Sequence, residues 1–233
     1  MGIVYKGKCT LNKGIINMPQ MVSDNLKLCY TLSSYSGANS IRNLIKNEDL
    51  TLNNSPVINS SFNFNGVDQS ITGSHSGIDL TNSTIDLWIK IEDQGSSARK
   101  VPFYISDTSS KFIFIDVSPN VNYLQVNTES KNINVRSTNS LQYPSKFFNL
   151  TVVRTSSEIK VLLNSFLVNL TLNEGYTGAW NPGVNLVSLG ASIFANVPQD
   201  FFSGSLYQVR VYDRALNELQ ILENYTSWKG KFY

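Results

Sequence analysis

The sequence is poor in the residues that support disulfide frameworks, metal sites and helices. Its 233 residues include two cysteines, one histidine and only six alanines, against 27 asparagines and 30 serines. Two cysteines are too few for a disulfide scaffold, and we expect both to be reduced in a chain made in the cytosol. Alanine is the strongest helix former, whereas asparagine and serine favour turns and caps, so the composition argues against a helical bundle.

The sequence also lacks a charge excess and long hydrophobic runs. Lys and Arg number 19 and Asp and Glu number 17, which gives a net charge of +2. That balance argues against nucleic acid as a partner, because phosphate binding concentrates positive charge. The apolar runs fall far short of the roughly 18–20 residues of a membrane helix, so no membrane span is expected. The first residues hold no uninterrupted apolar core of roughly 7–15 residues, so we expect no secretory signal.

What the sequence does have is repeated period-two alternation, which is typical of strands with one buried face. In residues 84–92, Ile85, Leu87 and Ile89 point to one side, and Asp86 and Trp88 point to the other. Further strands are expected at 111–117, 121–127, 132–137, 147–155, 158–164, 166–172, 184–191 and 204–213. Turn-rich stretches separate them, so the sequence predicts an all-β fold, an antiparallel β-sandwich or jelly roll, for residues 23–233.

One short helix is expected close to the C-terminal end, within residues 214–225. Asn217 and Gln220 have the spacing of a capping box, and Leu216 and Ile221 occupy the two positions of a hydrophobic staple. The predicted apolar stripe continues through Leu219, Leu222 and Tyr225. We expect this helix to pack on the edge of the sandwich.

Residues 1–22 differ from the rest in charge. They contain Lys6, Lys8 and Lys13 and no acidic residue, so this segment carries +3 while the remainder carries −1. Three interpretations stay open: an additional pair of N-terminal strands, an anchoring arm that docks on a partner chain, or disorder.

An ordered set of motifs runs through the chain. In order they are LKLCYTL (26–32), FNFNGVDQSITG (62–73), TIDLWIKI (84–91), LLNSFLV (162–168) and FFSGSLYQVRVYDRALNELQILENY (201–225). With these motifs, the run from Asp24 to Trp228 resembles a laminin-G-like, concanavalin A-like lectin/glucanase domain, of the kind found in bacteriophage virion proteins. The resemblance implies the fold but says little about the ligand, because this fold hosts lectins, hydrolases and structural modules.

Particular residues carry the resemblance, and each has an expected structural task. The family's Phe-x-Gly-x-Asp turn corresponds to Phe64, Gly66 and Asp68; Gly66 permits a backbone geometry that a side chain would block, and Asp68 can accept hydrogen bonds from turn amides. In the last motif the matching residues are Phe202, Gly204, Val209, Tyr212, Arg214, Ala215 and Leu216. Tyr212 is expected in the core, and Arg214 is expected to bridge the sheet edge and a loop. Ser165 follows Asn164 where the family usually has Asn-Gly.

No catalytic constellation is evident, so we expect no enzymatic activity. Glycoside hydrolysis needs two carboxylates about 5–10 Å apart, whereas Asp86 and Glu92 are six residues apart, or about 20 Å along a strand. His75 lies in a Gly/Ser-rich stretch without a metal-spaced or nucleophile partner, and is expected to be a solvated bystander.

No cofactor is expected. A calcium ion, common in relatives, would need clustered oxygens, but the candidate acids are scattered: Asp79, Asp107, Asp116 and Asp200.

Sugar binding remains open. It requires an exposed aromatic face for the apolar side of a pyranose, together with amide or carboxylate partners for hydroxyls. The stretch EGYTGAWNPG offers Tyr176, Trp180 and Asn181, although an aromatic residue in a loop often plugs the core instead. Tyr35 and Tyr104 are weaker candidates.

Three functions remain under consideration. The first is a virion surface protein of a bacteriophage (a head fibre, capsid decoration or tail-associated adhesin), made in the host cytoplasm and binding glycans on a host surface or in the environment. It would join other virion proteins through residues 1–22 and form a homo-oligomer. Three features favour this function. The fold is typically extracellular but no secretory signal is expected, the first segment is basic, and little alanine with much asparagine, isoleucine and lysine suggests an A/T-rich coding sequence. The alternatives are a carbohydrate-binding module of a bacterial secreted or surface protein, and a glycan hydrolase or lyase.

Overall fold

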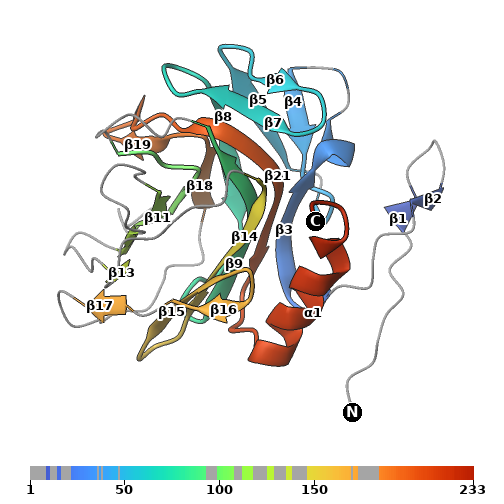
Figure 1. The fold of residues 1–233 in the computed structure, drawn as a ribbon. Helices are drawn as coiled ribbons and strands as arrows, with labels where there is room; N and C mark the ends of the chain where they lie inside the picture. Colours follow the sequence, from blue (N-terminus) through green and yellow to red (C-terminus); the bar gives the residue numbers. More distant parts are fainter. Residues whose placement is uncertain are drawn as a thin grey trace.

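The fold is a two-layer antiparallel β-sandwich. A computed structural model describes residues 9–10, 15–16, 22–35, 37, 39–46, 48–92, 99–107, 112–117, 125–128, 135–137, 146–168, 170–172 and 184–233. Two large sheets pack face to face, and helix α1 (Glu218–Lys229) lies outside one of them (Figure 1). The predicted fold class, all-β with one short C-terminal helix, is confirmed.

The described strands fall into two large sheets and two small ones. The nine-stranded sheet has the order β17-β13-β12-β11-β10-β18-β8-β5-β4. Its strands are β4 (Ser40–Arg42), β5 (Asp49–Asn53), β8 (Ser70–Ser76), β10 (Phe103–Ser106), β11 (Phe112–Asp116), β12 (Gln125–Thr128), β13 (Val135–Ser137), β17 (Leu170–Leu172) and β18 (Val184–Leu189). The eight-stranded sheet has the order β16-β15-β14-β9-β21-β7-β6, with β3 paired to β21. Its strands are β3 (Leu26–Thr31), β6 (Val57–Ile58), β7 (Phe62–Asn65), β9 (Ser83–Ile91), β14 (Phe148–Arg154), β15 (Ile159–Leu163), β16 (Phe166–Leu167) and β21 (Ser203–Tyr212). The small sheets pair β1 (Cys9–Thr10) with β2 (Ile15–Ile16), and β19 (Ser192–Phe194) with β20 (Val197–Gln199).

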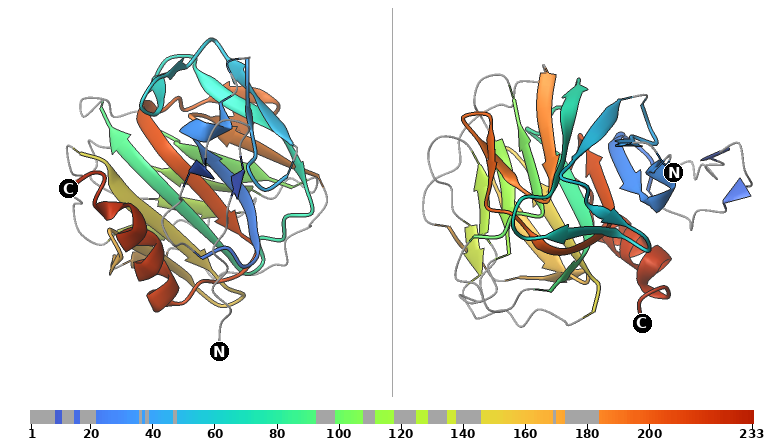
Figure 2. Two further views of the ribbon diagram at one scale, coloured as in Figure 1. Left: turned by 90° about the vertical axis from the view of Figure 1, so that its right-hand side faces the viewer. Right: turned by 90° about the horizontal axis from the view of Figure 1, so that it is seen from above.

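The alternation predicted for β9 is confirmed on its core side and is wrong on its other side. Ile85, Leu87 and Ile89 point between the sheets and are at most 1% exposed. Asp86 and Trp88 were expected toward solvent, yet they are 2% and 0% exposed. The reason is tertiary: α1 and the residues after it lie against part of the outer face of the eight-stranded sheet (Figure 2), where they bury Trp88, and Asp86 is buried in an ion pair with Arg210.

The helix begins as predicted but packs differently. Asn217 caps it, and Gln220 completes the capping box. Its buried residues are Ile221, Asn224 and Tyr225, whereas the predicted stripe residues Leu219 and Leu222 are 77% and 45% exposed. The helix therefore turns a mixed polar and aromatic side to the outer face of the sheet, and the prediction that it packs on the sandwich edge is wrong.

The segment predicted as one strand at 166–172 is divided between the two sheets. β16 pairs with β15 in the eight-stranded sheet, and β17 pairs with β13 in the nine-stranded sheet. β15 and β16 are joined by the two-residue turn Asn164–Ser165, in which both residues have positive φ, 51° and 67°. Positive φ at both central residues defines the type I′ hairpin turn, so Ser165 forms it in place of glycine.

The two glycines of the family motifs are required by close backbone contacts. Gly66 has φ +74°, and a Cβ there would lie 2.7 Å from the Ser203 Cβ. Gly204 has φ +152°, and a Cβ there would collide with the backbone oxygen of Lys90. The neighbouring turn departs from the prediction: the Asn65 side-chain oxygen, and not Asp68, accepts the backbone amides, while Asp68 accepts from the Asn65 side chain at 2.8 Å.

Three further predicted residues have defined contacts. Phe64 is 4% exposed in the core. Tyr212 is fully buried, as expected, and its hydroxyl donates to the Val22 carbonyl at 3.0 Å. Arg214 links the chain before β3 to the helix, because it donates to the Asp24 carbonyl and to the Gln220 side chain, both at 3.2 Å. Docking of residues 1–22 on a partner stays a prediction.

Candidate functional site

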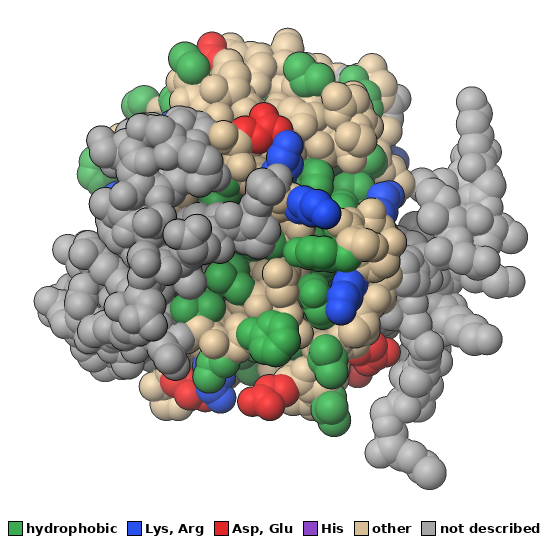
Figure 3. All heavy atoms as spheres, viewed as in Figure 1, with side chains coloured by type: hydrophobic (Ala, Val, Ile, Leu, Met, Phe, Trp, Pro, Cys, Tyr) green, Lys and Arg blue, Asp and Glu red, His purple; other side chains and the backbone are tan. Residues whose placement is uncertain are grey.

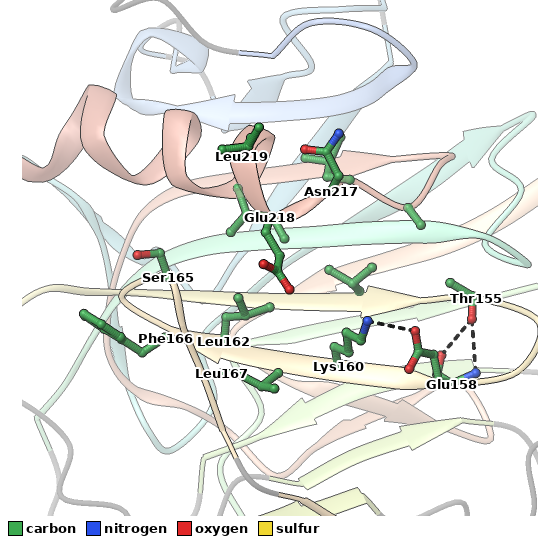
Figure 4. A pocket seen from close by; sticks show the side chains of 14 residues that line it. Thr155, Glu158, Lys160, Leu162, Ser165, Phe166, Leu167, Asn217, Glu218 and Leu219 are labelled. Atoms are coloured by element: carbon green, nitrogen blue, oxygen red, sulfur yellow. Dashed lines mark hydrogen bonds and ion pairs between the residues drawn. The ribbon is translucent and has the colours of Figure 1, made fainter.

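A groove of about 710 Å³ opens between the β15–β16 hairpin and the start of α1. Figure 4 shows the hairpin on one side and the first helical residues on the other. Its apolar lining residues are Val153, Leu162, Phe166, Leu167, Ala215, Leu216, Leu219 and Ile221, and its polar ones are Thr155, Glu158, Lys160, Ser165, Asn217 and Glu218. The groove lies where the start of α1 passes beside β15 and β16, which form one edge of the eight-stranded sheet.

The floor of the groove follows from strand alternation. Val152 and Val161 point into the core between the sheets, so their neighbours Val153 and Leu162 point outward and form the floor together with Leu216. Each of these floor residues is at most 5% exposed. The floor is therefore apolar and well packed.

The walls of the groove expose large apolar side chains to solvent. Phe166, Leu167 and Leu219 are 76%, 61% and 77% exposed. In Figure 3, hydrophobic side chains and both kinds of charge gather over β15, β16 and the start of α1. Exposed apolar patches rimmed by polar groups mark binding surfaces more often than scattered single residues do.

The charges of the rim come from one lysine and two glutamates. The Lys160 ammonium lies 2.9 Å from the Glu158 carboxylate. The Glu158 side chain raises the pKa of Lys160, and Glu218 adds to that shift. Figure 4 shows Glu218 pointing from the helix toward β15, on the side of Lys160. The groove thus combines one exposed aromatic ring with hydrogen-bond donors and acceptors, which suits a ring-shaped ligand with hydroxyl groups.

The structure does not test the sugar-binding residues predicted from the sequence. Tyr176, Trp180 and Asn181 lie outside the described residues. Of the weaker candidates, Tyr35 is 38% exposed, whereas Tyr104 is 7% exposed and packs against Phe112. Sequence reasoning missed Phe166 because FLVNLTL was interpreted as a single half-buried strand; its place directly after a tight turn was the available signal.

The prediction that His75 is a solvated bystander is wrong. Its side chain lies on β8, is 1% exposed and connects the two sheets. One ring nitrogen is hydrogen bonded to the Tyr30 hydroxyl on β3, and the other lies 2.6 Å from the Glu48 carboxylate. Burial lowers the pKa of His75, although Glu48 opposes this effect. Tyr30 is fully buried, so this chain of hydrogen bonds offers no accessible nucleophile and acts as an inter-sheet link.

Asp86, the acid considered for hydrolysis, is occupied by structural contacts. Its carboxylate forms an ion pair with Arg210, and it accepts hydrogen bonds from the side chains of Asn149 and Thr151. Arg210 is 0% exposed. All four residues of this network are at most 2% exposed.

The structure also bears on metal and membrane binding in the described part of the chain. Among the described residues, no three His, Cys, Asp or Glu side chains gather as they would around a metal ion. No helix in the same part of the chain is long and apolar enough to span a membrane. Calcium binding therefore stays untested.

Two antiparallel sheets, a C-terminal helix and an open groove define a lectin-like β-sandwich protein. The chain belongs to the concanavalin A-like lectin/glucanases superfamily, whose family model matches residues 65–222. No curated protein sequence matches the chain.

Solved structures with the same fold come from proteins of several activities. The sialidase of Trypanosoma rangeli superposes with a TM-score of 0.67 at 11% identity, over 90% of this chain and 34% of its own. Domain 4 of AbnA, a GH43 extracellular arabinanase from Geobacillus stearothermophilus solved in complex with arabinotriose, gives 0.56 at 18% identity, over 86% and 98%. The receptor binding domain of botulinum neurotoxin C/D mosaic serotype gives 0.66 at 15% identity, over 87% and 51%. The chain spans about a third of the sialidase, and these identities establish the fold alone.

Proposed function

We propose that this protein binds glycans without cleaving them, and that the groove between β16 and α1 is the binding site. The observation that carries the proposal is Phe166, an aromatic ring that is 76% exposed beside an apolar floor and a polar rim. A pyranose can lay its apolar face on this ring while its hydroxyls bond to the rim. The arabinotriose complex of AbnA domain 4 supports the proposal by analogy of fold only.

The rim has the hydrogen-bonding groups that sugar hydroxyls require. Lys160 can donate, Glu218 can accept, and the Asn217 side chain can do both at the helix start. The groove is open to solvent, so we expect weak binding at each site, and several copies raise the effective affinity without new contacts.

The wider setting that we propose is the surface of a bacteriophage virion, with the protein displayed as a homo-oligomeric fibre, decoration or adhesin. The basic segment at residues 1–22, with Lys6, Lys8 and Lys13, would join the other virion proteins. A mass-spectrometric inventory of purified particles tests this setting, and absence of the protein from them would refute it. Replacing the three lysines with serine should reduce incorporation into particles.

A carbohydrate-binding module of a bacterial surface protein is the alternative setting. It predicts the same groove binding but no association with particles, so the same inventory separates the two settings.

Glycan hydrolysis is the second candidate function, because Glu158 and Glu218 both line the groove. A hydrolase would release reducing sugar from a bound glycan and would lose that activity in the Glu218→Gln variant. We expect no product to form, since Glu158 is paired with Lys160 at 2.9 Å.

A glycan array read with paired variants tests the binding proposal. Phe166→Ala should abolish the array signal. Phe194→Ala is the matched control, because Phe194 is also a widely exposed phenylalanine (68%) but lies on the β19–β20 hairpin. An array without hits, or equal loss in both variants, would refute the groove. Loss of signal in Trp180→Ala with retention in Phe166→Ala would place the site in the residues predicted from sequence instead.

A further inference from the structure

A second ring-sized site lies at the opposite end of α1 and is filled by the chain's own last residues. Trp88, Phe147, Tyr207, Tyr225 and Trp228 form what we call the aromatic pocket, on the outer face of the eight-stranded sheet. The Phe232 ring occupies it: its centroid lies 4.7 Å from that of Trp88, 4.9 Å from that of Phe147 and 5.0 Å from that of Tyr207. The pocket therefore already holds a planar six-membered ring stacked on an indole.

Four buried polar atoms on the residues of this pocket, or on the residue paired with Trp88, have no hydrogen-bond partner within the described part of the chain. Gln208 lies opposite Trp88 in the pairing of β21 with β9 and is 0% exposed. Within the described part of the chain, neither atom of the Gln208 side-chain amide finds a hydrogen-bond partner, nor do the indole nitrogens of Trp88 and Trp228. Buried polar groups are almost always hydrogen bonded, so four such atoms around one pocket call for an explanation.

The unpartnered atoms point to a ligand with hydroxyl groups. The two indole nitrogens can only donate, whereas the Gln208 amide both donates and accepts. A phenylalanine ring cannot satisfy any of them. A pyranose has nearly the same size, stacks its apolar face on an indole, and carries hydroxyls that both donate and accept.

The segment that fills the pocket is held to the sandwich by the Phe232 ring and by three hydrogen bonds, one of which runs from the Asn164 side chain to the Tyr233 hydroxyl at 3.4 Å. We call residues 230–233 the C-terminal strap. Lys231 lies over the Tyr207 ring, 4.4 Å from its centroid, and donates to the Tyr207 hydroxyl. The Tyr233 hydroxyl donates to the Phe147 carbonyl at 3.2 Å. The remaining backbone hydrogen bonds of the strap run to Trp228 and Lys229 at the end of α1, so they can persist when the strap lifts from the sheet.

We propose that the aromatic pocket is a binding site for an uncharged pyranose, and that the C-terminal strap competes with the sugar for it. Trp88 supplies the stacking face, and the Gln208 amide supplies the hydrogen bonds that fix the orientation of the ring. This site is separate from the groove and does not depend on it. The apparent affinity equals the intrinsic affinity of the open pocket multiplied by the fraction of molecules in which the strap leaves the pocket open.

Variants of the full chain test the strap. Phe232→Ala should open the pocket. We expect this variant to bind methyl glucoside, methyl galactoside or N-acetylglucosamine at least about tenfold more tightly than the unaltered protein does. Quenching of tryptophan fluorescence and saturation-transfer NMR of the sugar report the binding. Phe232→Leu is the matched control, because leucine keeps the pocket filled, and it should behave as the unaltered protein does. Lys231→Ala should shift binding in the same direction by a smaller factor, and it serves if Phe232→Ala does not fold.

A further variant separates a binding role from a merely structural one. Gln208→Leu, added to Phe232→Ala, should abolish sugar binding while raising the urea midpoint, because it removes an unpartnered buried amide. Phe166→Ala, added to Phe232→Ala, should leave this binding intact, which distinguishes the pocket from the groove. The proposal is overturned if a folded opened variant binds none of the three sugars, if Gln208→Leu leaves binding unchanged, or if opening yields only dimers with exchanged straps.

Discussion

The buried ion pair between Asp86 and Arg210 provides the sharpest test of what stabilises the outer face of the eight-stranded sheet. The two side chains are 2% and 0% exposed. Asp86→Asn removes the charge that pairs with the Arg210 guanidinium. Removing one partner of a buried pair costs about 3–5 kcal/mol, a large part of the roughly 5–15 kcal/mol stability of a typical domain. Urea unfolding followed by tryptophan fluorescence measures this loss.

A matched exposed pair calibrates the measurement. Arg42 and Asp49 lie 3.3 Å apart with side chains that are 61% and 42% exposed, so Asp49→Asn should cost less than about 1 kcal/mol. Replacing both Asp86 and Arg210 with apolar residues should recover part of the loss, although Asn149 and Thr151 would lose their acceptor. Equal effects of Asp86→Asn and Asp49→Asn would refute the view that burial decides the strength of this pair.

Three further predictions concern the links between elements. The free energy of unfolding should fall as the pH drops below about 6.5. Burial lowers the pKa of His75 in the folded protein from 6.5, so the unfolded chain binds the proton more tightly than the folded protein does. The free energy of unfolding should fall further below pH 4.5, since the hydrogen bonds of Glu48 with His75 and Ser76 outweigh burial and lower the pKa of Glu48; urea midpoints across this pH range measure both effects. Gly204→Ala should cost about 1–3 kcal/mol by forcing a Cβ against the Lys90 carbonyl, seen as a lower Tm. Asn217→Ala should cost about 0.5–2 kcal/mol by removing the α1 cap, measured by urea unfolding, and no change would contradict the capping role.

Local patterns predicted the parts of the fold that depend on neighbours in sequence. The alternation of Ile85 and Leu87 and the Asn217 capping box need only a few adjacent residues, and both are confirmed. The short strands β4 to β8 were not predicted individually, because segments of two to seven residues carry little periodic signal. The division of 166–172 between two sheets depends on partners far away in the chain, so alternation could not reveal it.

The outer face of the eight-stranded sheet shows why the candidate sites were harder to predict than the fold. Alternation predicts that a strand has two faces, but not what covers the second face. Trp88 and Asp86 were therefore expected on a face that nothing covers. His75 was misjudged for the same reason: the Tyr30 and Glu48 side chains that enclose it are 45 and 27 positions away. A lone histidine in a polar stretch gives no sign of such partners.

The same covered face links stability to binding in this protein. The Asp86–Arg210 pair satisfies its polar groups inside the molecule, whereas the Gln208 amide beside it has no partner within the described residues. A buried glutamine without hydrogen-bond partners does not stabilise the fold, because an apolar side chain of similar size would avoid the desolvation penalty of the amide. If Gln208→Leu stabilises the protein and removes sugar binding, the glutamine is explained by its ligand. If the variant is destabilised, the amide supports the fold, and the aromatic pocket is structural.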